Sequence, residues 1–387
     1  MSNFKNKKVL VFGLGLNQGG VGVAKFFAKN GAEVRVTDLK NENDLQVSLD
    51  QLKEFNNISY TLGGHKFEDL DWADLIIKNP AIKPGNKYIE YALEKNKEVE
   101  TDFSIFLQFA NQKKLIAITG TKGKTTTASL IFEALRADNQ QVILTGNIGK
   151  SILDTLTHLD KDPWIIVEMS SFQLQALKGK NFSPKIAVIT NIYPDHLNWH
   201  SSMEEYIQAK KIVALGQSSD DFLVVPSQGV LHSKQFQQDI RSQIVEFCAE
   251  DFEEDFPNID LPLKGLANLE NYATALTVTG ILKIADKKAL QAFQNFKGAR
   301  FRLQEIGVFN GVKIINDSTS TNPISTIEAL ATLGPGVILI AGGMNKGMQY
   351  HELAAQIENY TPVKSLYLLE GDATKEITKY LRSPAIA

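Results

Sequence analysis

The segment 120–127 reads Gly-Thr-Lys-Gly-Lys-Thr-Thr-Thr, and its residue types and spacing suit phosphate chemistry. It follows an apolar run at 115–118 and precedes a helical pattern at 128–135. A glycine-bearing turn between a buried strand and a helix directs backbone N–H groups toward the phosphates of a nucleotide. In this arrangement Lys124 reaches the terminal phosphates and Thr125 can ligate magnesium. The spacing is closer to TGTxGKT than to the general GxxxxGKT pattern, and it predicts a nucleotide phosphate site.

Two further strand ends in the same part of the chain carry candidate ligands. Residues 164–167 predict a buried strand that ends at Glu168, and residues 186–190 predict another that leads to His196. Doubly wound sheets bind ligands at the carboxyl ends of their strands, where a carboxylate can hold the magnesium of a nucleotide. The alternative for Glu168 is a carboxylate that caps the following helix. His196 could ligate a second metal ion or orient a phosphate, and the alternative is a packed histidine.

The elements that must position these residues follow an α/β pattern. Strand-like apolar runs alternate with helical patterns almost throughout the chain, which indicates parallel sheets covered on both faces. The length of 387 residues allows two or three domains. We expect three domains built on largely parallel sheets: a Rossmann-like domain at 1–110, a central P-loop domain at 111–298 and a Rossmann-like domain at 299–387.

The first domain has a glycine turn of its own. A strand at 9–12 leads into Gly13-Leu14-Gly15-Leu16, then a helix, then a strand that ends at Asp38. An acidic residue in this place often meets a ribose hydroxyl. The turn continues through more glycines than the dinucleotide fingerprint has, so we expect a nucleotide other than NAD.

The third domain opens after a hinge at 297–301. Residues 303–308 and 312–315 predict a hairpin that turns at Asn310-Gly311, a strong turn signal. Further strands are expected at 337–341 and 366–369.

Composition narrows the class of protein. The formal net charge is −3 and no long basic run occurs, so nucleic acid is not favoured as a partner. The single cysteine, Cys248, excludes a disulfide framework and suits a reducing cytosol. The N-terminus has no signal-peptide pattern, and no stretch approaches the ~18 apolar residues of a membrane span. These features predict a cytoplasmic protein without a membrane span.

Several motifs together resemble the Mur ligase family, the ATP-dependent amide-bond ligases of peptidoglycan precursors. In order, they are TGTKGKTTT, VEMSSFQL, TNIYPDHLNWH, the lysine of YIQAK, GLAN and INDS. The resemblance covers essentially the whole chain and is greatest to members that join D-glutamate to UDP-N-acetylmuramoyl-L-alanine. It implies that ATP phosphorylates the substrate carboxylate and that the amine of D-glutamate attacks the acyl phosphate. We expect the enzyme to be a monomer.

The resemblance also implies roles for single residues. The expected catalytic residues are Lys124, Lys210 and His196, with two magnesium ions, one held by Thr125 and Glu168 and one by His196 and Lys210. Expected ATP contacts come from Gly120, Thr121, Lys122, Gly123, Lys124, Thr125, Thr126, Asn268, Arg300 and Asp317. Expected substrate contacts come from Gly15, Leu16, Asn17, Asp38, Asn79, Asn147, Thr321 and Lys346.

Lys210 corresponds to the family's carbamylated lysine. Burial lowers the pKa of an amine, so that more of it is neutral and can add carbon dioxide. The product is an anion with two oxygens, which suits it to orient metal ligands. From its neighbours in the sequence alone, a solvated helix lysine is the alternative.

The chain departs from the family pattern in three places. Thr319 stands where the best-known members have a lysine that contacts D-glutamate, and a threonine cannot pair with a carboxylate as an ammonium does. Ala267 and Ala299 replace family histidines. The chain stops at residues 383–387, before a family loop that contacts D-glutamate, so the third domain is expected to be short of its family length. The alternatives are an incomplete fragment, a domain shortened in this lineage and a missing piece on another chain. Alternatives are another Mur-type amide ligase, or a protein that binds nucleotide and UDP-sugar without ligating.

Overall fold

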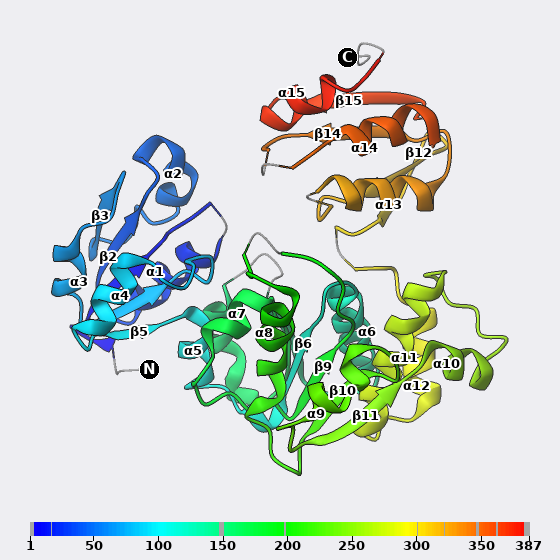
Figure 1. The fold of residues 1–387 in the computed structure, drawn as a ribbon, viewed down its shortest axis with the longest axis horizontal. Coiled ribbons are helices and arrows are strands. Elements are labelled where there is room, and N and C mark those ends of the chain that lie inside the picture. The colour runs from blue at the N-terminus through cyan, green and yellow to red at the C-terminus, as the bar shows by residue number, and fades with distance from the viewer. Residues whose placement is uncertain are drawn as a thin grey trace. The chain divides into compact units, whose positions relative to one another are not determined.

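The computed structural model describes residues 4–16, 18–146, 151–196, 199–299, 301–320, 322–345, 348–360 and 363–382. The chain divides into two compact units, Met1–Phe296 and Lys297–Ala387 (Figure 1). In the described part of the chain, no helix combines the length and apolarity needed to cross a bilayer.

The N-terminal sheet of the first unit has the strand order β3-β2-β1-β4-β5, and neighbouring strands are parallel. Its elements are β1 (Lys8–Phe12), α1 (Gln18–Lys29), β2 (Glu33–Asp38), α2 (Glu42–Asp50), β3 (Ile58–Leu62), α3 (Phe67–Trp72), β4 (Leu75–Lys78), α4 (Lys87–Glu94), β5 (Glu98–Glu100) and α5 (Asp102–Leu107). Alternate side chains of β1 enter different apolar clusters on its two faces, as a strand covered on both sides requires. The strand order reverses between β1 and β4, which is where such a sheet binds its ligand.

The second sheet of this unit has the order β11-β10-β9-β6-β8-β7, again with parallel neighbours. Its strands are β6 (Leu115–Thr119), β7 (Val142–Gly146), β8 (Trp164–Glu168), β9 (Ile186–Ile189), β10 (Phe222–Pro226) and β11 (Gln243–Phe247). Its helices are η2 (Gln112–Lys114), α6 (Lys124–Ala137), η3 (Ile152–Lys161), α7 (Ser171–Ala176), α8 (Met203–Leu215), η4 (Val230–His232), α9 (Lys234–Gln237), α10 (Ala249–Asp255), α11 (Leu266–Ile281) and α12 (Asp286–Gln294).

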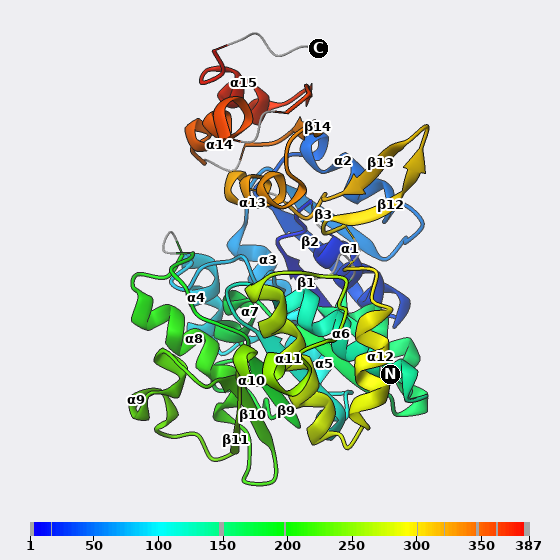
Figure 2. The same cartoon turned by 90° about the vertical axis from the view of Figure 1, so that its right-hand side faces the viewer.

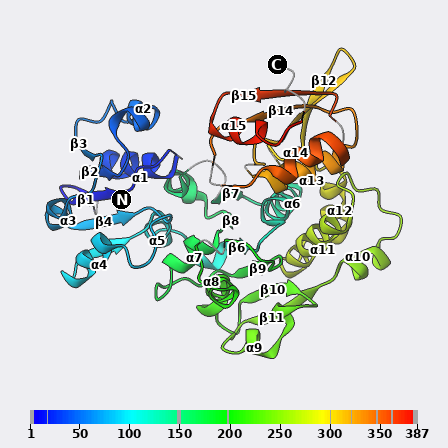
Figure 3. The same ribbon diagram turned by 45° about the horizontal axis from the view of Figure 1, so that its top comes forward.

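Helices cover both faces of this sheet, so the predicted α/β class is confirmed. Helices α6, α11 and α12 pack together (Figure 2). Helices α7 and α8 pack against each other on the opposite side of the strands (Figure 3). Strand β6 lies between β8 and β9 with every residue buried, which matches the apolar run expected before the phosphate turn.

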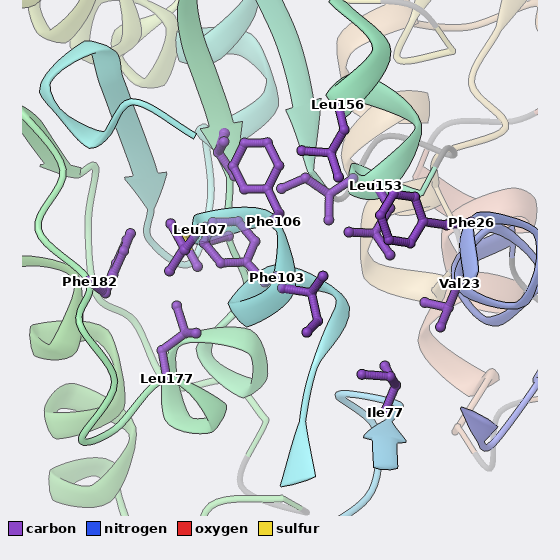
Figure 4. Close-up of a cluster of buried hydrophobic side chains, with 14 of the residues drawn as sticks. Val23, Phe26, Ile77, Phe103, Phe106, Leu107, Leu153, Leu156, Leu177 and Phe182 are labelled. Carbon is purple, nitrogen blue, oxygen red and sulfur yellow. The ribbon is translucent and has the colours of Figure 1, made fainter. Parts of the chain in front are cut away.

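One apolar core joins the two sheets of the first unit. Its side chains come from α1, α5, η3 and the segment after α7, as Figure 4 shows with Phe26, Phe106, Leu153 and Phe182. Burying a large apolar side chain contributes about 1.5–3 kcal/mol. A shared core of this extent explains why residues 4–296 form one compact unit.

The second unit contains the predicted hairpin. Strands β12 (Gln304–Phe309) and β13 (Val312–Asn316) are antiparallel, and both turn residues have positive φ, 49° at Asn310 and 78° at Gly311. That geometry is the reason for the Asn-Gly turn signal. Strands β14 (Ile338–Gly342) and β15 (Ser365–Leu369) form a parallel pair. Its helical segments are α13 (Pro323–Leu333), α14 (His351–Ala355), the π-helical turn Gln356–Tyr360 and α15 (Asp372–Thr378), and they share an apolar cluster with β15.

Candidate active site

The phosphate turn between β6 and α6 depends on glycine at two positions. Gly120 has φ of 143°, and a Cβ there would lie 1.9 Å from Thr190 Oγ1. Gly123 has φ of 85°, precedes α6 as its N-cap, and a Cβ there would lie 2.3 Å from Asn271 Oδ1. Because any side chain would collide with these groups, the turn can approach β9 and α11 only with glycine. The strand–turn–helix predicted from the sequence is present.

The end of β9 holds this turn in place. The Thr121 backbone N–H donates to Asn191 O at 3.0 Å, and the Lys122 N–H donates to Asn191 Oδ1 at 2.9 Å. Thr190 Oγ1 donates to Lys122 O at 2.6 Å. Asn191 was not among the residues predicted for the site, although a polar residue directly after a buried strand was a usable signal.

The side chains of Lys124 and Thr125 lie at the N-terminus of α6. Lys124 Nζ donates to Gly120 O at 3.1 Å and to Thr121 O at 2.9 Å. Thr125 Oγ1 donates to Glu168 Oε2 at 2.7 Å, and Glu168 is 4% exposed at the end of β8. The predicted pair of magnesium ligands is therefore in contact.

This oxygen pair fits a magnesium ion bound together with a nucleotide. Mg²⁺ prefers hard oxygen ligands and is usually held by one or two protein groups plus phosphates and water. In the described part of the chain, no group of three or more His, Cys, Asp or Glu side chains could hold a metal ion without such help.

Lys210 of α8 is buried beside the phosphate turn. Its side chain is among the largest that are fully buried, and the residue is 2% exposed. Its Nζ donates to Gly120 O at 2.9 Å and to Thr119 Oγ1 at 3.4 Å. Burial is the main cause that holds the pKa of Lys210 well below its usual range; the Lys124 charge adds to this, and Asp195 opposes it. Burial excludes the solvated-lysine alternative and favours the neutral amine.

His196 follows β9 in a left-handed backbone conformation, with φ of 54°. Its side chain is half-exposed, and its Nε2 lies 3.6 Å from Asp195 Oδ2. Burial lowers the pKa of His196; Asp195 opposes this, and the positive charges of Lys210 and Lys124 add to it. The expected catalytic residues therefore interact electrostatically around one turn.

Tyr206 belongs to this site but was missed in the sequence. It is 1% exposed, its hydroxyl lies 3.1 Å from Thr121 Oγ1, and Lys210 Nζ lies 4.6 Å from the centre of its ring. Burial raises the pKa of Tyr206 to about 12, with the Thr121 hydrogen bond opposing, so its phenol stays protonated. Its position one helical turn before Lys210 was the available signal.

Asn268 is connected to α6 through a chain of side chains. Asn271 Nδ2 donates to Asn268 Oδ1 at 3.3 Å, and Thr127 Oγ1 donates to Asn271 Oδ1 at 3.1 Å. Thr126 is the last residue of the segment 120–126 that is expected to contact ATP, and it is buried in the first turn of α6.

Three of the expected substrate-binding residues come together at the carboxyl ends of β1, β2 and β4. The Gly15 N–H donates to Asp38 Oδ2 at 2.9 Å, and Asn79 Nδ2 donates to Gly13 O at 3.4 Å. Leu16, in the same turn, is 42% exposed.

In the second unit, Asp317 holds its own loop. It accepts hydrogen bonds from the Leu303 N–H at 2.9 Å and from the Ser320 hydroxyl. Thr319 donates through its N–H and hydroxyl to Phe301 O. Five further expected residues lie outside the described part of the chain: Asn17, Asn147, Arg300, Thr321 and Lys346.

Fold and site together define a nucleotide-dependent enzyme with a P-loop-like turn, and sequence comparison gives the family. Residues 118–258 match the Mur ligase middle domain, and residues 7–101 match the Mur ligase MurD-like N-terminal domain. The chain belongs to the Mur ligase family.

Its curated relatives are more specific. The UDP-N-acetylmuramoylalanine--D-glutamate ligase of Borreliella burgdorferi (strain ZS7) is 34% identical over 100% of this chain and 87% of that protein. The protein of the same name from Streptococcus agalactiae serotype III (strain NEM316) is 36% identical over 97% of this chain and 84% of that one.

Solved structures agree on the fold. UDP-N-acetylmuramate-alanine ligase MurC from Thermotoga maritima superposes with a TM-score of 0.59 at 19% identity, covering 96% of this chain and 87% of that chain. A murein peptide ligase from Psychrobacter arcticus gives 0.56 at 16% identity, covering 97% and 88%.

Proposed function

We propose that this chain joins D-glutamate to UDP-N-acetylmuramoyl-L-alanine, using ATP, in the synthesis of peptidoglycan precursors. The proposal rests on one observation: Lys124, the Thr125–Glu168 pair, His196 and Lys210 surround a single phosphate turn. It is supported by relatives that are named for this reaction, of which the chain covers 87% and 84%. We further propose that the enzyme works in the cytoplasm as a monomer.

The reaction balances in two steps. The terminal phosphoryl group of ATP passes to the carboxylate of UDP-N-acetylmuramoyl-L-alanine and leaves ADP and an acyl phosphate. The amine of D-glutamate then attacks the acyl carbon, loses a proton, and expels inorganic phosphate as the amide forms. Both steps bring anions together, so positioning and charge neutralisation supply most of the catalysis.

The residues around the phosphate turn supply the first part of that neutralisation. Backbone N–H groups of the turn and of α6 would hold the phosphates, and Lys124 would place its charge on the migrating phosphoryl group. Thr125 and Glu168 would hold the nucleotide's magnesium, which when bound neutralises phosphate charge.

The second part of the charge neutralisation would come from Lys210 and His196. The amine of Lys210 is buried and its pKa is lowered by burial, which suits it to carbamylation, in which the nitrogen adds carbon dioxide and loses a proton. The carbamate, together with His196, would hold a second magnesium ion close to the substrate carboxylate. Both the carbamate and the second ion are part of the proposal.

The remaining expected residues would bind the substrates. We assign the UDP-linked substrate to the carboxyl edge of the N-terminal sheet and to the residues Gly15, Leu16, Asn17, Asp38, Asn79 and Asn147. We assign ATP to the phosphate turn, residues 120–126, with Asn268, Arg300 and Asp317. We assign D-glutamate to Thr321 and Lys346, because Thr319 cannot provide the charge of the family lysine.

Release of inorganic phosphate tests the function directly. The protein is supplied with ATP, Mg²⁺ and UDP-N-acetylmuramoyl-L-alanine, and then separately with D-glutamate, L-glutamate, D-aspartate or L-alanine. We expect release with D-glutamate alone, together with a product heavier by one glutamyl residue.

Other outcomes would redirect the assignment. In a parallel assay with UDP-N-acetylmuramate as the substrate, release with L-alanine would identify a different Mur-type ligase. ATP binding without release under any of these conditions would identify a binding protein.

A further inference from the structure

A second histidine, His200, lies at the centre of the site but has no expected role. It is 0% exposed, and its Nε2 lies 2.9 Å from Ser171 Oγ, within hydrogen-bonding distance. Its Nδ1 has no hydrogen-bond partner among the described residues and lies 3.8 Å from Glu205 Oε1. Because most buried polar side-chain atoms have a hydrogen-bond partner, the Ser171 bond is the one that fixes the orientation of this ring.

The Ser171 bond connects His200 to the segment that carries Glu168. Ser171 is the first residue of α7, is 1% exposed, and stands three positions after Glu168. The segment between Glu168 and Ser171 has a further contact, because Thr119 Oγ1 donates to Met169 O at 2.9 Å. Movement of Ser171 would therefore shift the strand end that positions the Glu168 carboxylate.

His200 also fixes the segment that carries His196. The backbone N–H of His200 donates to His196 O at 3.0 Å, and His196 has a left-handed backbone conformation. The His200 side chain packs against α7, because its ring stacks on Phe172 with centroids 5.8 Å apart and planes 20° apart. Phe172 in turn meets the His196 ring edge-on at 4.9 Å.

The third contact is to α8. The His200 and Tyr206 rings lie 5.3 Å apart, and Tyr206 lies directly under Lys210 Nζ. His200 therefore contacts three segments from separate parts of the chain, those that carry Glu168, His196 and Lys210. Its ring meets α7 and α8, and its backbone N–H bonds to His196.

We propose that His200 is a positioning residue that holds the β8–α7 turn, the loop after β9 and helix α8 in the arrangement needed for nucleotide-bound magnesium. It acts through the Ser171 hydrogen bond and through ring packing, without touching ATP or substrate. The proposal rests on the proposed function only in taking Thr125, Glu168, His196 and Lys210 as the residues around the metal. Residues that orient metal ligands typically change metal affinity by about 10–100-fold when they are replaced.

The test measures metal binding rather than turnover. Mn²⁺ replaces Mg²⁺ as a paramagnetic probe, and its binding in the presence of a non-hydrolysable ATP analogue is followed by electron paramagnetic resonance. Neither D-glutamate nor the UDP-linked substrate is present, so a failure of the proposed ligase activity would not affect this result.

Three variants separate the hydrogen bond from packing. His200→Phe keeps an aromatic ring and loses the bond, Ser171→Ala removes the same bond from the other side, and the third variant combines them. We expect each single variant to weaken Mn²⁺ binding about 10-fold. The double variant should bind no more weakly than the weaker single variant, because both remove one interaction. His232→Phe, at an exposed histidine paired with Glu246, is the matched control and should bind as the wild type does.

Two results would overturn the proposal. One is a Mn²⁺ dissociation constant of Ser171→Ala that stays within twofold of the wild-type value. This result counts against the proposal even if His200→Phe does not fold. The other is additive losses in the double variant, which would mean that the two side chains act separately.

Discussion

Two glycine-bearing turns occupy equivalent places in the two parallel sheets of the first unit, and the charges beside them are opposite. After β1, the carboxylate of Asp38 accepts the N–H of Gly15. After β6, the turn is followed by the ammonium of Lys124, with Lys210 behind it.

Under the proposed function, two turns of the same topology would bind different chemical groups of the substrates. A phosphate at the first turn would meet a carboxylate already bonded to the backbone, so this turn favours a group that donates hydrogen bonds, such as a hydroxyl of a nucleoside. The second turn offers N–H groups and positive charge, which favour phosphates. The neighbouring side chains, rather than the turn, decide which part of a ligand each sheet accepts.

The largest effect is expected from removing the charge at the second turn. Lys124→Ala should lower kcat by about three or more powers of ten with the fold intact, because a charge partner of the migrating phosphoryl group is lost. Phosphate release and circular dichroism measure the two properties. The exposed Lys178→Ala is the control and should retain full activity; more than about a tenth of wild-type activity in Lys124→Ala would contradict the role.

The next effect concerns the buried lysine behind that turn. Lys210→Ala should lose about two to three powers of ten in kcat, and acetate or formate should restore part of it, because the site needs an anion there. Intact mass of the wild type, measured under carbon dioxide, should show the carbamate. Lys211→Ala removes a neighbouring buried lysine whose Nζ donates to Gln238 O, and no carboxylate should affect its activity.

At the first turn, the comparison predicts a change in substrate affinity. Asp38→Asn keeps the shape but loses the charge, so the KM for the UDP-linked substrate should rise about 10–100-fold, the cost of one charge-assisted hydrogen bond. The KM for ATP should stay within about twofold, since the second turn is unchanged. Equal increases in both constants would show that the two turns are not separate sites.

The smallest effect is expected from Tyr206→Phe. It removes the hydroxyl next to Thr121 and keeps the ring under Lys210, so only the phosphate turn loses a partner. The net contribution of one hydrogen bond, about 0.5–1.5 kcal/mol, predicts that the dissociation constant for the nucleotide rises about 2–12-fold. Isothermal titration calorimetry with an ATP analogue measures this constant. A value equal to that of the wild type would show that the Tyr206 hydroxyl does not contribute to nucleotide binding.

Sequence patterns predicted the elements with good accuracy wherever the cause was local. The turn at 120–123 was predictable because the glycines, the lysine and the flanking strand and helix are contiguous. The hairpin at Asn310-Gly311 was predictable because the two residues accept positive φ. The contact of Thr125 with Glu168 followed from a general rule, since carboxyl ends of neighbouring parallel strands meet at one edge.

The sequence alone thus determined that the chain has a phosphate turn, which residues form it and which sheet edge it occupies, because these depend on adjacent residues and on strand periodicity. Only the tertiary structure decided that Lys210 is buried rather than solvated, that Asn191 braces the turn and that His200 joins three segments. Lys210 and Gly120 are 90 residues apart in the chain. Their contact depends on the order of strands in the sheet and on desolvation, and neither is encoded in the spacing of a local motif.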